Sequence, residues 1–125
     1  MNSYIRICVV LILTATTSAC ALTKGYREGH LRAQEAYLQD ALSMMRKGIS
    51  RYDTENGRPP QTLDELVEGN YITLIPRDPI TNELNWIIVI HECPTPVPDN
   101  CKQGIKDIHS ASTAKSSRGN PYSDW

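Results

Sequence analysis

The chain of 125 residues contains no phenylalanine, and aromatic residues make up only 6% of it. Its core must therefore be built mainly from leucine, isoleucine, valine, methionine and tyrosine side chains. It also lacks any block of like charges, since 13 Lys+Arg balance 14 Asp+Glu to a net charge of −1. Binding to nucleic acid needs clustered positive charge that faces phosphate, so the sequence argues against that class of protein. The length fits one domain with a small core, which excludes most large enzyme architectures.

The N-terminus lacks an apolar run long enough to cross a bilayer. The continuous apolar stretch is only Ile7–Leu13, and even residues 7–22 number 16. At about 1.5 Å of rise per residue such a helix is shorter than the roughly 30 Å hydrocarbon layer. A positive end at Arg6, a short apolar core and small residues at 14–19 are typical of a secretory signal. We therefore expect residues 1–22 to be a signal or membrane-anchor segment and residues 23–125 to be exported.

The junction Thr17-Ser18-Ala19-Cys20 resembles a bacterial lipobox, in which the cysteine is acylated and becomes the mature N-terminus. The sequence leaves three alternatives open. The protein is a lipoprotein acylated at Cys20, or it keeps an uncleaved or pilin-type membrane anchor, or its signal is cleaved and it is secreted. All three alternatives place the rest of the chain outside the cytoplasm.

Two of the four cysteines, Cys93 and Cys101, bracket a segment rich in turn-forming residues, PTPVPDN. In an oxidising compartment this pair is expected to form a disulfide that closes a hairpin loop. A zinc site made of His91, Cys93, Cys101 and His109 is the competing interpretation. It is disfavoured because Cys101 and His109 are eight residues apart, without the close spacing typical of zinc ligands.

Apolar residues recur at helical spacing between Tyr26 and Tyr52, which predicts one long helix over residues 26–53. Polar residues, Glu35 and Arg46 among them, lie between these positions and are expected on the solvent-facing side. Asn56-Gly57 and Pro59-Pro60 are expected to end the helix. The predicted core stripe of the helix consists of Leu31, Leu38, Leu42, Met45, Ile49 and Tyr52.

The remaining residues, 54–125, are expected to form the globular part. Thr62-Leu63-Asp64-Glu65 is a capping-box sequence that predicts a short helix to Glu68. The β-branched run 86–90 predicts a buried strand, and residues 105–110 a partner strand across the cysteine-linked loop. Residues 110–120 are polar and are expected to form a surface loop, while Trp125 is expected to dock on the helix or sheet.

A catalytic role is disfavoured. The most suggestive grouping is His91-Glu92 with Asp107 and His109, with Ser110 and Ser112 as nearby hydroxyls. A hydrolase would need a nucleophile beside its base and donors for a developing oxyanion, and no nucleophile-elbow glycine pattern surrounds these serines. No phosphate loop, dinucleotide fingerprint or paired CxxC is present either.

The order of these segments resembles the major pseudopilin of bacterial type II secretion systems (protein G) and, more broadly, type IV pilin-like proteins. The resemblance covers most of residues 30–125 and depends on the combination of its motifs in order. The residues that carry it are 42–49, Tyr52, Asn56-Gly57, Pro60, 63–67, Tyr71, 75–81, Trp86, 104–110 and 122–125.

The resemblance implies an α+β, pilin-like fold, in which a long N-terminal helix packs on a small antiparallel sheet beside a short second helix. It implies a structural subunit that assists protein export across the outer membrane, with its globular domain in the periplasm and its N-terminus in the membrane. The implied partners are other pseudopilins and inner-membrane secretion components. The alternative is a periplasmic lipoprotein whose pilin-like domain binds a partner without polymerising.

The N-terminus and the C-terminal loop depart from the pseudopilin pattern. Polar Arg27-Glu28 follows Lys24-Gly25-Tyr26, and the apolar stretch precedes it, so cleavage at Gly25 would discard the anchor. Pseudopilins of this kind commonly bind calcium in an acidic C-terminal loop, but residues 110–120 contain no carboxylate. Calcium prefers several anionic oxygen ligands, and Asp107 and Asp124 alone would make a poor cage. We therefore expect no cofactor and disfavour calcium.

Overall fold

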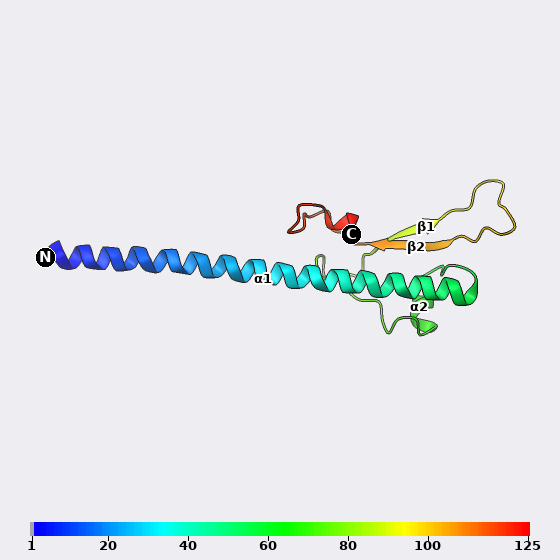
Figure 1. Cartoon of the computed structure of the whole chain (residues 1–125), viewed down its shortest axis with the longest axis horizontal. Helices are drawn as coiled ribbons and strands as arrows, with labels where there is room; N and C mark the ends of the chain where they lie inside the picture. Colours follow the sequence, from blue (N-terminus) through cyan, green and yellow to red (C-terminus); the bar gives the residue numbers. More distant parts are fainter. Residues whose placement is uncertain (1) are drawn as a thin grey trace. The chain divides into compact units, whose positions relative to one another are not determined.

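A computed structural model of the chain describes residues 2–125, with the side chains of residues 3, 4 and 24–125. In chain order its elements are α1 (Asn2–Asn56), α2 (Asp64–Glu68), β1 (Ile87–His91), β2 (Gly104–His109) and the 3-10 helix η1 (Tyr122–Asp124) (Figure 1). The chain divides into two compact units, residues 1–33 and residues 34–125. One long helix and a small two-stranded antiparallel sheet make the protein α+β, as predicted from the sequence.

The long helix begins much earlier than the sequence periodicity indicated. The predicted start was Tyr26, whereas α1 begins at Asn2. Residues 2–24 contain neither proline nor glycine, so no residue in this stretch strongly opposes helix formation. The assignment of residues 1–22 as a signal or anchor depends on side chains that, apart from residues 3 and 4, lie outside the described ones. Within the described part of the chain, no helix combines the length and hydropathy needed to span a membrane.

The helix ends three residues later than predicted, at Asn56, and for the expected reason. Gly57 has a φ of +63°, a left-handed conformation that glycine adopts at little cost and that stops the helix. Pro59 and Pro60 then prevent it from resuming. The Asn56 side-chain amide donates hydrogen bonds to the Tyr52 carbonyl and the Tyr71 hydroxyl, both at 2.9 Å, which ties the helix end to the following segment.

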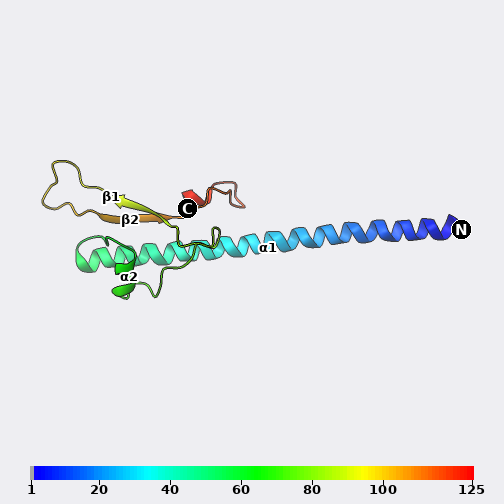
Figure 2. The same ribbon diagram turned by 180° about the vertical axis from the view of Figure 1, so that it is seen from behind.

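The core forms around one face of α1 between residues 38 and 52. Leu38, Leu42, Met45, Ile49 and Tyr52 are all buried and belong to a single apolar cluster. In Figures 1 and 2 the sheet and α2 lie on opposite sides of this part of α1. Ala41 of α1 belongs to the same cluster. Its other members come from the segments after α1: Leu63, Leu66, Ile72, Trp86, Ile105, Ile108 and Tyr122.

Gly48 allows the segment after α2 to approach α1 closely. A Cβ atom built on Gly48 would lie 2.7 Å from the Ile72 side chain, closer than real Cβ atoms come to their neighbours. The absence of a side chain at this position therefore allows Ile72 to pack directly on the helix backbone.

The capping box at the start of α2 forms only in part. The Thr62 hydroxyl accepts a hydrogen bond from the Glu65 N–H at 3.3 Å, as the sequence predicts. The Glu65 carboxylate instead accepts hydrogen bonds from the Tyr52 hydroxyl and from Arg58. The Tyr52 hydroxyl lowers the pKa of Glu65, with a smaller contribution from Arg58. This carboxylate therefore links α2 to α1.

Strand β1 occurs where the sequence predicts it, displaced by one residue, but it is not buried. Each residue of Ile87–His91 is exposed, and Trp86, just before the strand, is the buried one. The antiparallel register pairs Ile87 with His109 and His91 with Gly104, with an irregularity between Val89 and Ile90. The prediction of burial was wrong because, among the described residues, β1 pairs only with β2, whose Ile105 and Ile108 supply the contact with the core.

The C-terminal segment is more closely packed than a surface loop. Ser110 and Ser116 are buried, contrary to the prediction for residues 110–120. Tyr122 in η1 is buried in the core, and the Trp125 ring lies edge-on to it, with 5.2 Å between the ring centroids. The segment is held by polar contacts with α1 and β2.

Candidate functional site

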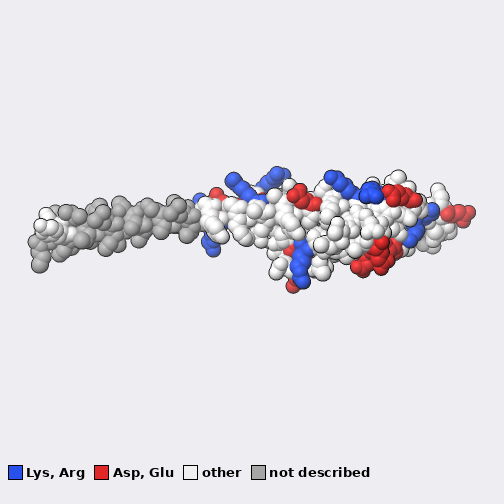
Figure 3. All heavy atoms as spheres, turned by 90° about the horizontal axis from the view of Figure 1, so that it is seen from below, with Lys and Arg blue, Asp and Glu red and all other residues white. Residues whose placement is uncertain are grey.

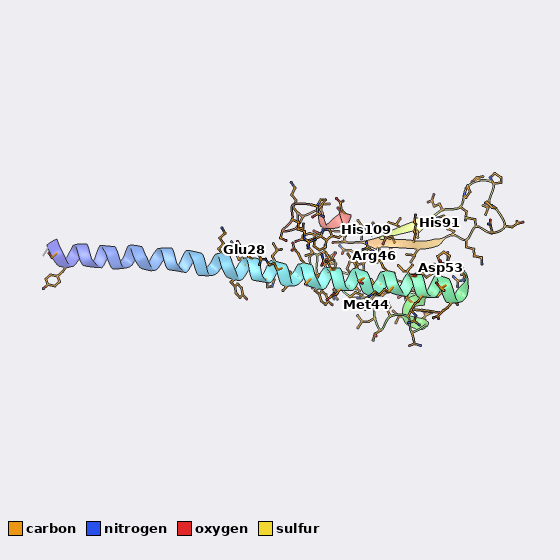
Figure 4. All side chains as sticks on the ribbon, in the orientation of Figure 1. Glu28, Met44, Arg46, Asp53, His91 and His109 are labelled. Carbon is orange, nitrogen blue, oxygen red and sulfur yellow. A yellow bond between two sulfur atoms is a disulfide. The ribbon has the colours of Figure 1, made fainter. Side chains whose placement is uncertain are left out.

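Arg46 on α1 connects three segments that are distant in sequence. Its Nε atom donates to the Asp107 carboxylate at 2.7 Å, and its Nη2 atom donates to the main-chain oxygens of Ile108 and Trp125, both at 2.8 Å. Figure 4 shows Arg46 and Met44 on opposite sides of α1, with Arg46 on the side of β2. The guanidinium is therefore fixed in position by its contacts with the sheet and with the C-terminal segment.

Asp107 is the acidic partner in this network. Burial opposes its charged form, but hydrogen bonds from the Ile108 N–H and from Arg46, together with the Arg46 charge, outweigh it and lower the pKa of Asp107. The other Asp107 oxygen lies 3.5 Å from Nε2 of His109, and His109 Nδ1 lies 2.6 Å from the Trp125 main-chain oxygen. The carboxylate therefore stays ionised between a cation and an imidazole.

Glu35 makes a second link between α1 and the C-terminal segment. Its carboxylate accepts hydrogen bonds from the Ser117 N–H and hydroxyl, both at 2.6 Å, and from the Tyr122 hydroxyl at 2.9 Å. The residue is only 8% exposed, so the expectation that it lies on the solvent-facing side is wrong. The donors that replace water explain why a carboxylate is accepted in this buried position.

Glu35, Ser117 and Tyr122 form what we call the Glu35 cluster. In this cluster the pKa of Glu35 is lowered and the pKa of Tyr122 is raised. Burial would raise the pKa of Glu35, but the hydrogen bonds from Ser117 and Tyr122, with the charge of Arg118, lower it. Burial, with the hydrogen bond to Glu35 and its negative charge, raises the pKa of Tyr122 to about 12. Glu35 is therefore the ionised acceptor and Tyr122 the neutral donor at neutral pH.

Asp78 is a second buried carboxylate, and it organises the backbone around it. It accepts hydrogen bonds from the Ile80 and Thr81 N–H groups at 2.7 and 3.4 Å, and from the Ser110 hydroxyl. Ser110 is therefore used to join the turn at residues 78–81 to the end of β2. Asp78 and Ser110 are both fully buried.

Cys93 and Cys101 lie at disulfide distance, with 5.8 Å between their Cα atoms. This pairing is the one expected from the sequence. His91 Nε2 lies 3.8 Å from the Cys101 sulfur, whereas His109 contacts Trp125 and Asp107. The four residues of the competing zinc interpretation are therefore not gathered into one ligand set.

The disulfide should contribute modestly to stability. Replacing both Cys93 and Cys101 by alanine is expected to lower the free energy of unfolding by up to about 2.5 kcal/mol, because the loop that they close is short. Urea denaturation of the full chain, followed by tryptophan fluorescence, measures the change. A loss well above this value, or two free thiols in the unreduced wild-type protein, would contradict the expectation.

The residues of the most suggestive catalytic grouping, which the sequence disfavours, are not all brought together. His91 pairs with Gly104 and His109 with Ile87, at opposite ends of the hairpin, as Figure 4 shows. Asp107 and His109 do come together, but the Ser110 hydroxyl is buried and donates to Asp78. None of the described contacts joins a serine hydroxyl to His91 or His109.

The residues near the C-terminal loop do not fit a calcium cage. Both oxygens of Glu35 accept hydrogen bonds from N–H and O–H donors, and Asp107 is paired with Arg46. Within the described residues, no group of three or more histidine, cysteine, aspartate or glutamate side chains is placed to hold a metal ion.

The other predicted site residues lie in different settings. Leu38, Leu42, Met45, Ile49 and Tyr52 face the core, whereas Leu31 is only half-buried and belongs to residues 1–33. The side chain of Cys20, the predicted acylation site, lies outside the described ones.

On the face shown in Figure 3, basic and acidic side chains are interspersed over the described part of the surface.

Glu35 and Arg46 are the important residues that the sequence analysis missed. The buried residues from Leu38 to Tyr52 are spaced alternately four and three residues apart. Glu35 lies three residues before Leu38 and continues this spacing, so the sequence did contain a signal that Glu35 is buried. Arg46 follows directly after the buried Met45, and no local pattern distinguishes it from the exposed Lys47.

The chain was compared with protein-family models, with curated proteins and with solved structures, and none of them matches it.

Proposed function

We propose that this protein is a structural, pseudopilin-like subunit of a type II secretion (type IV pilus-like) machine that assists protein export across the outer membrane. The observation that carries the proposal is the packing of residues 34–56 of α1. A single helix buries one stripe against a small antiparallel hairpin, a short α2 and a docked C-terminal segment. This is the arrangement that the sequence resemblance to type IV pilin-like proteins leads one to expect.

The polar side chains that join segments of the chain also support a structural role. The conspicuous polar groups, Glu35, Arg46, Asp78 and Asp107, are all used to connect segments of the chain with one another. In the proposed role the N-terminus tethers the protein to the membrane and the globular part lies in the periplasm. Its partners there are other pseudopilins and inner-membrane secretion components.

The experiment is photocrosslinking of the full-length protein in its own cells, with the photoreactive residue at exposed positions of α1 such as Tyr37. Crosslinks to pseudopilins or to inner-membrane secretion proteins, identified by mass spectrometry, would support the proposal. A photoreactive residue at Leu84, also exposed but on the loop before β1, is the matched control. Crosslinks that are the same from both positions, or the absence of any secretion component, would contradict it.

Mass spectrometry of the mature protein's N-terminal peptide shows how the protein is tethered to the membrane. We expect either an uncleaved N-terminal segment or an N-terminus acylated at Cys20. An acylated Cys20 without crosslinks to secretion proteins would instead support a periplasmic lipoprotein whose pilin-like domain binds a partner without polymerising. A methylated Tyr26 at the N-terminus would contradict the tether, because residues 1–25 would then have been removed.

A further inference from the structure

A cavity of about 590 Å³ lies between α1 and the C-terminal segment. All the charged residues that line it are basic: Arg46 and Lys47 from α1 and Arg118 from the C-terminal segment. Neither Lys47 nor Arg118 forms an ion pair among the described residues. Lys47 and Arg118 therefore bring to the cavity positive charge that no ion pair among the described residues neutralises, whereas the charge of Arg46 is paired with Asp107.

Arg46 also retains hydrogen-bonding capacity at this site. A guanidinium has five N–H donors, and the contacts with Asp107, Ile108 and Trp125 use the one on Nε and the two on Nη2. The two donors on Nη1 have no partner among the described residues. Nη1 is not a buried unsatisfied atom either, so it is not fully enclosed by the protein. Each free Nη1 donor can form a charge-assisted hydrogen bond to one carboxylate oxygen of a ligand.

The dimensions of the cavity favour an extended ligand. Its α1 side runs from Gln39 to Ser50, about 16 Å along the helix axis. An extended peptide of about five residues has this length. The amide of Gln39 and the hydroxyls of Ser43 and Ser50 can bond to a peptide backbone. Leu42 and Trp125 add apolar surface for an aliphatic side chain.

We infer that this cavity binds an extended acidic segment of a partner protein, with one carboxylate on Arg46 and others near Lys47 and Arg118. The inference goes beyond the proposed role in secretion, because it concerns the chemistry of a ligand and not the identity of an assembly. A single inorganic anion would use only part of the cavity and should therefore bind more weakly than the peptide.

The test measures binding of a fluorescein-labelled peptide, Glu-Leu-Glu-Glu-Leu-Glu, to the full-length protein in nonionic detergent by fluorescence anisotropy. We expect Lys47→Gln and Arg118→Gln each to raise Kd about threefold to fivefold. Lys115→Gln, a basic residue of the same C-terminal segment that does not line the cavity, should leave Kd unchanged. Binding should weaken as salt is raised, because the partly exposed charges become screened.

Three results would overturn the inference. The first is equal binding of the matched neutral peptide, Gln-Leu-Gln-Gln-Leu-Gln. The second is an equal effect of Lys115→Gln and Arg118→Gln, which would indicate attraction by overall charge. The third is displacement of the labelled peptide by inorganic phosphate at the concentration at which unlabelled acidic peptide displaces it. That result would identify a site for small anions. Each of these results leaves the crosslinking test of the proposed function unaffected.

Discussion

Replacing Leu42 by alanine should lower the free energy of unfolding by about 2–5 kcal/mol. Leu42 is 2% exposed and lies in the middle of the buried stripe of α1, in the cluster that includes Ile105 and Ile108 of β2. Truncation removes three methyl or methylene-sized groups from contact and leaves a cavity that the fixed helix cannot close. Few single substitutions in this chain should cost more.

Urea denaturation of the full-length protein measures this effect. Trp86 is a suitable probe, because its ring is buried and its Nε1 atom donates to the Pro76 carbonyl at 2.8 Å. Leu84→Ala is the matched control, since Leu84 is 57% exposed and its truncation should change stability by less than about 0.5 kcal/mol. A change of the same small size for Leu42→Ala would show that this face of α1 contributes little to the core.

Replacing Glu35 by alanine should cost about 3 kcal/mol, because it leaves the Ser117 N–H and the Tyr122 hydroxyl without their acceptor. Glu35→Gln should cost less, because the amide oxygen can still accept one of these hydrogen bonds. Glu28→Ala is the matched control on the same helix, since Glu28 is exposed. Equal stabilities of all three variants would contradict a structural role for the Glu35 cluster.

The stability of the wild type should also depend on pH through Glu35. Because the folded protein lowers the pKa of this carboxyl, the stabilisation is complete above the ordinary value of 4.5 and is lost as the pH falls through the lower, folded-state value. Glu65 and Asp107 have lowered pKa values and contribute in the same direction. As the pH falls below about 5, the free energy of unfolding should therefore decrease less in Glu35→Gln than in the wild type. It should still decrease, because Glu65 and Asp107 remain.

The sequence was sufficient to predict the main elements of the fold. Helical spacing identified the buried residues Leu38 to Tyr52, and Gly57 with the two following prolines accounted for the end of α1. The cysteine spacing indicated the pair at 93 and 101. These features depend on local patterns of side chains, which a single sequence displays directly.

The features that were missed depend on contacts between distant segments. The carboxylate of Glu35 is accepted in the interior only because Ser117 and Tyr122, more than eighty residues later, supply donors. Strand β1 has the composition of a buried strand, and its exposure follows from the number of strands beside it, which its own residues do not encode. The start of α1 was placed too late because apolar periodicity marks the amphipathic part of a helix, whereas α1 extends beyond that part.

The links between α1 and the C-terminal segment have a consequence for the order of folding. Arg46 and Glu35 find their partners at residues 107–125, so these contacts close loops of more than sixty residues. Contacts of such high sequence separation form late, because the entropy of loop closure must be lost before they form. During synthesis, Leu63, Leu66 and Ile72 can pack on the stripe of α1 first, but the part of the stripe that Ile105, Ile108 and Tyr122 cover stays in contact with water until those residues have emerged. Until then, the uncovered apolar side chains leave the nascent chain exposed to misassociation.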